Sequence, residues 1–185
     1  TSQIAFMAKK TSNLNVEIKS IKLHNFETNG VFTIPTDGTD PQQKSWGYKH
    51  IPNNDGFTVI KDATISVGTE ATDISTKTPM FLIPQTLTKW DTSHNIETAN
   101  AKKESYLSIE CKISIGDSYK LGSKSGYGTL YVPFGADWEP GKRYVYTLIF
   151  GGGYDADGNT ILQPINFDAS VEEWPTDENS TKSDI

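Results

Sequence analysis

Two runs of alternating apolar residues in the last third of the sequence most constrain the fold. Each run has an apolar residue at every second position: Tyr144, Tyr146, Leu148 and Phe150 in the first, and Ile165, Phe167, Ala169 and Val171 in the second. Side chains alternate between the two faces of a β-strand, so each run places its apolar residues on one face. Both runs are therefore predicted to be strands that cover a hydrophobic core.

The rest of the chain has the same character. Short β-branched and aromatic runs are separated by Gly, Pro, Asn and Asp, and helical periodicity is nearly absent. This pattern is typical of an all-β fold of antiparallel sandwich or barrel type, with very little helix. The length of 185 residues allows one large domain or two small ones. We place a junction at the dense apolar run that ends in Pro84, which gives domains at 1–78 and 79–175 and a polar tail at 176–185 that is expected to be disordered.

The phase of the alternation changes within one early strand. Val16 and Ile18 are followed by Ile21 and Leu23, so one extra residue must be absorbed near residues 19–20. This predicts a β-bulge. Because Asn29 and Gly30 form a turn signal, residues 21–26 and 31–34 are predicted to pair as a hairpin.

Charge and cysteine content exclude several classes of function. The net charge is -6 and the calculated pI is about 5.0, so no basic face is available for nucleic acid or an anionic membrane. No apolar run approaches the roughly 20 residues that span a bilayer. The single cysteine, Cys111, alternates in phase with aliphatic residues and is predicted to be a buried, unreactive thiol.

No set of residues in the sequence indicates catalysis, so we predict neither enzyme activity nor a cofactor. The three histidines lie far apart and lack zinc-ligand spacing. The segment containing Asp155, Asp157 and Asn159 is similar to the start of a calcium loop, but Asn166 stands where a bidentate Glu is needed. The alternative is a turn rich in residues that tolerate positive φ, at the tip of a glycine-rich hairpin.

A long polar loop at residues 35–56 carries Trp46, Tyr48 and His50. Aromatic residues in a long loop are the candidate contacts for a glycan or a host ligand. The alternative is that Trp46 and Tyr48 pack onto the edge of the sandwich. Trp90, Trp138 and Trp174 are further possible stacking platforms, although the last two have the sequence context of residues that close a core.

Several motifs together resemble the fimbrillin family of Bacteroidales. These are FLIPQTLTKW at 81–90, YLSIECKI at 106–113, YVPF at 131–134, WEPGKRYVYTLIF at 138–150, GGGYDADG at 151–158 and PINFDASVEEW at 164–174, together with the bulged front segment at 2–26. The similarity covers nearly all of the chain except residues 35–78 and the tail.

The resemblance implies two transthyretin-like β-sandwich domains in tandem, and because the chain opens inside the first of them, that domain is expected to be incomplete. It implies a fimbrial subunit or adhesin-like lipoprotein at the outer membrane of the cell. Its partners are expected to be other fimbrial subunits, joined by strand addition. Relative to the family pattern, the chain is expected to lack the leader, the first strands and the lipid anchor.

Overall fold

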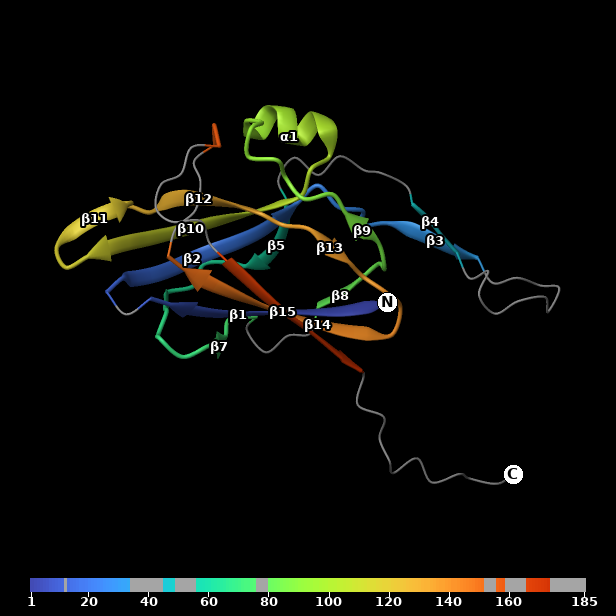
Figure 1. Cartoon of the computed structure of the whole chain (residues 1–185), viewed down its shortest axis with the longest axis horizontal. Helices are drawn as coiled ribbons and strands as arrows, with labels where there is room; N and C mark the ends of the chain where they lie inside the picture. Colours follow the sequence, from blue (N-terminus) through green and yellow to red (C-terminus); the bar gives the residue numbers. More distant parts are fainter. Residues whose placement is uncertain are drawn as a thin grey trace, which may run out of the picture.

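The computed structural model describes residues 1–11, 13–33, 45–48, 56–75, 80–151, 156–158 and 166–173. These residues form an all-β fold with one short helix, α1 (Ile96–Lys102). Figure 1 shows two layers of strands, a small hairpin that extends from one end, and α1 beside the second layer. The all-β class expected from the sequence is therefore confirmed.

The first sheet contains the two ends of the described chain. Its strand order is β15 (Asn166–Glu173), β14 (Lys142–Phe150), β1 (Ser2–Lys10), and then β7 (Thr72–Asp73) with β8 (Met80–Leu82). β1 runs parallel to β14, from Gln3 opposite Arg143 to Lys10 opposite Phe150. Its other neighbours, β7 and β8, are antiparallel to it. β1 is thus an interior strand of this sheet.

The second sheet is built on the antiparallel pair of β2 (Asn15–His24) and β10 (Tyr106–Ile115). β10 also pairs with β11 (Ser118–Leu121) and β12 (Gly128–Pro133), while β2 pairs with β5 (Phe57–Ile60) and β6 (Ile65–Ser66). Two small ribbons complete the fold: β9 (Thr86–Leu87) with β13 (Ala136–Asp137), and β3 (Gly30–Thr33) with β4 (Ser45–Tyr48).

The core lies between the two sheets and is formed by the alternating residues of each strand. Its fully buried members include Ile4, Phe6 and Ala8 of β1, Leu107, Ile109, Cys111 and Ile113 of β10, and Leu148 and Phe150 of β14. Burial raises the pKa of the Cys111 thiol to about 12. The predicted buried, unreactive cysteine is confirmed.

The predicted bulge is present in β2. Ser20 lies opposite Glu110 and Ile18 lies opposite Cys111, so Lys19 has no partner in the register with β10. The extra residue restores the phase of the alternation. Ile18 and Ile21 can therefore both face the core, and both are fully buried.

The strands do not separate at residue 78 as the sequence analysis expected. In the first sheet β1 pairs with β14, and in the second β2 pairs with β10, so both sheets combine strands from the two sides of that position. Their side chains also share one hydrophobic core. The described residues of the two segments 1–78 and 79–175 therefore form a common sandwich and not two in tandem, because each segment supplies only part of each sheet.

The predicted hairpin between residues 21–26 and 31–34 is wrong. β3 pairs with β4, and the neighbours of β2 are β10, β5 and β6. The chain leaves β2 at Asn25, which has a φ of 58°. Phe26 then turns into the core, where its ring meets those of Phe57 and Trp138 edge-on. Burial of Phe26 thus separates β3 from β2.

The position of the helix α1 was not predicted from the sequence. Asn95 caps its first turn by accepting a hydrogen bond from the Thr98 amide at 2.8 Å, and Lys103 ends it in the left-handed conformation. Only Ala99 of the helix is buried. Such a short helix has little apolar periodicity for a sequence pattern to reveal.

Candidate functional site

The predicted ligand contacts lie mostly outside the described part of the chain. The backbone of Trp46 and Tyr48 forms part of β4, but their side chains and the whole of His50 are outside the described residues. Ligand contact and edge packing both stay predictions for this loop.

Two other tryptophans are not available as stacking platforms. Trp90 and Trp138 are each only 2% exposed. The Trp138 indole donates a hydrogen bond to the Tyr146 hydroxyl at 2.9 Å, and the Trp90 indole donates to the His94 carbonyl at 2.9 Å. The platform hypothesis is therefore wrong for these two residues, while Trp174 is outside the described part of the chain.

The candidate calcium ligands are only partly described. Asp155 and Asn159 fall outside the described residues, and Asp157 lies exposed in a turn. Gly158 has a φ of 84°, and a side chain there would collide with the carbonyl oxygen of Thr92. Across the described ranges, no group of three or more His, Cys, Asp or Glu side chains is placed to hold a metal ion. The calcium site stays a prediction, and Gly158 has the backbone that the alternative, a turn, requires.

The strand β15 forms an open edge of the first sheet. Among the described strands it pairs only with β14, with Val171 opposite Tyr144 and Ala169 opposite Tyr146. Residues directly opposite in an antiparallel pair share a face, so Ala169 and Val171 lie on the core side of the sheet. Both are nevertheless exposed, Val171 by 60%.

This exposure corrects one expectation from the sequence. Residues of the second apolar run were expected to cover the core, as Tyr144, Tyr146, Leu148 and Phe150 do in β14. At Ala169 and Val171 the expectation is wrong, since both residues are exposed. We call the exposed core-side surface at Ala169 and Val171 the open β15 face. It leaves apolar surface beside an edge that no other described strand pairs with.

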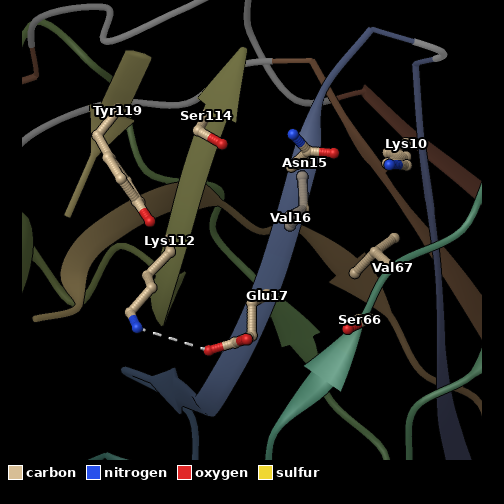
Figure 2. A pocket seen from close by; sticks show the side chains of 9 residues that line it. All are labelled: Lys10, Asn15, Val16, Glu17, Ser66, Val67, Lys112, Ser114 and Tyr119. Atoms are coloured by element: carbon tan, nitrogen blue, oxygen red, sulfur yellow. Dashed lines mark ion pairs between the residues drawn. The ribbon is translucent and has the colours of Figure 1, made fainter. Parts of the chain in front are cut away.

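A polar pocket lies at one end of the sandwich, where β1 ends and β2 begins (Figure 2). It has a volume of about 230 Å³, and its lining includes Lys10, Glu17, Lys112 and Tyr119. The Lys112 ammonium lies 3.8 Å from the Glu17 carboxylate and 4.5 Å from the centre of the Tyr127 ring. Tyr127 also donates a hydrogen bond to Glu17 at 2.5 Å. Its described lining contains serines but no histidine or cysteine.

A larger hollow lies on the outer face of the second sheet. This groove has a volume of about 420 Å³ and is lined by β2, β10, β12 and α1. Its lining residues are Ser20, Lys22, His24, Ile96, Asn100, Tyr106, Ser108, Glu110, Thr129 and Tyr131. We call it the sheet-face groove. No motif in the sequence predicted this groove, because its lining residues come together only through the pairing of β2, β10 and β12.

His24 is held tightly in the wall of this groove. Its ring stacks on Tyr106 with centroids 4.6 Å apart, and its Nε2 lies 2.8 Å from the Ser108 hydroxyl oxygen. Gly56, with a φ of 72°, brings its backbone so close that a Cβ there would lie 2.5 Å from the ring. Burial, and secondarily the positive charge of Lys22, lowers the pKa of His24 from 6.5 to about 4. The imidazole is therefore neutral at neutral pH.

The depressed pKa of His24 predicts a loss of stability in acid. The stability that comes from keeping His24 neutral is fully present above pH 6.5. It is lost as the pH falls through about 4, because His24 binds a proton more readily in the unfolded chain than in the folded one. We expect a decrease of roughly 2–3 kcal/mol in the free energy of unfolding between pH 7 and 4. Urea titrations of wild type and His24→Gln across this range measure it. All other groups are the same in the two proteins, so an equal decline in both would contradict the assignment to His24.

Comparisons with known proteins give one family and one similar solved structure. The sequence matches a family described as fimbrillin-like over residues 1–174. No curated protein matches the chain. Among solved structures, the chain is similar to one titled a "putative cell adhesion protein" from Bacteroides eggerthii, with 11% identity and a TM-score of 0.39. The match covers 94% of this chain and 55% of that one, so this chain spans about half the length of its neighbour.

Proposed function

Because the chain belongs to the fimbrillin-like family, we propose that it is a cell-surface fimbrial or adhesin-like subunit that joins its neighbours by β-strand addition. The observation that carries the mode of joining is the open β15 face. It combines an edge with no further strand in the described residues and a valine that is 60% exposed on the core side of the sheet.

Addition of a strand would both pair the edge of β15 and cover the exposed Val171. The unpaired backbone groups along β15 can continue the hydrogen-bond ladder into a strand from another subunit. A side chain of that strand, or of a segment next to it, can cover Val171 and remove apolar surface from water. The main-chain bonds supply affinity, and the apolar contact fixes the register.

In this proposal, the cell-surface location and the non-catalytic role are taken from the fimbrillin-like family. The subunit is displayed at the outer surface of the cell and attached through a lipid anchor. No helix in the described residues is long and apolar enough to cross a membrane. We assign the subunit no catalytic role, and the candidate partners are other subunits of the same assembly.

A thiol placed on β15 tests the proposed contact. Ser170 is exposed on this strand. The native Cys111 should not react with the maleimide, because it is fully buried and its pKa is raised to about 12. In Ser170→Cys we expect rapid labelling by a maleimide in the monomer and at least tenfold slower labelling in fimbriae on producing cells, because strand addition covers the edge.

The matched control is Ser125→Cys, which places a thiol at an exposed turn far along the second sheet. It should label equally in monomer and fimbriae. Equal labelling at position 170 in both states would contradict strand addition at β15. If producing cells carry no assembled form of the protein, the subunit role itself is wrong.

A further inference from the structure

The sheet-face groove is shaped by small side chains on the central strand and by larger groups around them. The register places Lys22, Ser108 and Tyr131 in one row across β2, β10 and β12. The next row holds Ser20, Glu110 and Thr129. Ser108 leaves a depression between Lys22 and Tyr131, while α1 forms a wall with Ile96 and Asn100. The volume of about 420 Å³ lies within the roughly 300–1,000 Å³ of small-ligand sites.

The aromatic end of the groove is fixed before any ligand binds. Tyr106 donates a hydrogen bond to the Asn100 side chain at 2.9 Å, and Asn25 donates to the same oxygen. The Tyr106 ring packs edge-on against Trp90 and Tyr131, each with centroids 5.9 Å apart. Tyr131 is only partly buried, so part of its ring faces the groove. A fixed aromatic wall binds without a large entropic cost.

The charges in the groove balance. His24 is uncharged at neutral pH, as its lowered pKa shows. Glu110 and Lys22 carry opposite charges, and Glu110 is oriented by the Ser20 hydroxyl at 2.6 Å and by Lys19 at 3.6 Å. The groove therefore lacks the excess positive charge that selects phosphate or sulfate.

The remaining lining groups are hydroxyls, an amide, an ammonium and a carboxylate. Such groups donate and accept hydrogen bonds in several directions around one space. A ligand that meets them needs many hydroxyl groups, little charge and an apolar face for the tyrosine ring. Neutral sugars have this combination.

From this geometry we propose that the sheet-face groove binds a short, uncharged glycan, with Glu110 accepting sugar hydroxyls and Tyr131 contacting a sugar ring. This role goes beyond strand-mediated assembly and uses a different sheet from the open β15 face. It gives the subunit an adhesive surface that stays exposed when β15 is paired.

Binding to defined oligosaccharides tests the proposal on the full chain. The neutral probes are N-acetyllactosamine, mannotetraose and cellotetraose, and a sulfated heparin tetrasaccharide is the charged probe. Saturation-transfer NMR detects contact and calorimetry measures the Kd. We expect at least one neutral probe to bind. In Glu110→Gln its affinity should fall at least tenfold, because a charge-assisted hydrogen bond is lost. Tyr131→Ala should weaken binding by a similar factor.

The control Glu70→Gln makes the same change of charge at an exposed turn outside the groove and should bind like wild type. Circular dichroism and urea titration show whether each variant is folded. The proposal is overturned if no neutral probe binds, if the heparin fragment binds more tightly than all of them, or if folded Glu110→Gln and Tyr131→Ala bind like wild type. These results are independent of maleimide labelling at position 170, so either proposal can fail alone.

Discussion

Phe6→Ala is expected to lower the free energy of unfolding by about 3–5 kcal/mol. Phe6 is completely buried at the middle of β1, and its ring lies 5.9 Å from that of Phe134 and 5.7 Å from that of Tyr146. Its backbone is fixed by bonds to Ser75 and Ile74, so the strand cannot shift to close the space. Truncation therefore leaves a cavity and also removes the burial of the ring.

Equilibrium denaturation in urea measures this loss as a lower midpoint at unchanged slope. Phe81→Ala is a matched control, since it removes the same atoms from β8 in the same sheet, where the ring is 53% exposed. It should cost about 1 kcal/mol or less. Equal losses in the two variants would show that the core between the sheets does not depend on Phe6.

Alternation of residues predicted most of what lies inside the sandwich. The side-chain period of two placed Leu107, Ile109, Cys111 and Ile113 on one face, and all are buried. The change of phase after Ile18 predicted the bulge, because a strand cannot otherwise keep its apolar residues on the core side. These properties are local, so they can be read from neighbouring residues alone.

The partners of each strand were not local, and they were predicted poorly. An apolar face shows that a strand is half-buried but carries no information on which strand lies beside it. β1 pairs in parallel with β14, although more than 130 positions separate Gln3 from Arg143. The expected domain boundary and the expected hairpin both assumed that near neighbours in sequence pair. Burial of Phe26 and the parallel pair override that assumption.

The candidate sites depend on register, which explains why the sequence did not reveal them. His24 and Tyr106 stack only because β2 and β10 pair with these residues opposite each other. Val171 is 60% exposed, although the apolar pattern of β15 is the same as that of a buried strand. A sequence pattern gives the face on which a residue lies, but the extent of the facing sheet decides whether that face is covered.

Removal of β1 is expected to abolish cooperative folding of the chain. β1 contributes Ile4, Phe6 and Ala8 to the core, all 1% exposed or less. Exposing the Ile4 and Phe6 side chains to water costs about 1.5–3 kcal/mol each, before the cost of the cavity is added. The buried backbone of β14 would also lose its ladder partner. A typical domain has only about 5–15 kcal/mol of stability. We therefore expect a chain of residues 11–185 to show no cooperative urea transition.

A peptide with the sequence of residues 1–10 should restore that transition, because the removed strand lies between β14 on one side and β7 and β8 on the other. The same peptide carrying Phe6→Lys is the control and should not restore it, since a charge cannot enter the core. Calorimetry and the urea midpoint at increasing peptide concentration measure the effect. A shortened chain that unfolds at the wild-type midpoint would show that β1 is dispensable. Recovery with the native peptide would instead show that this sheet accepts a strand from another molecule in its interior.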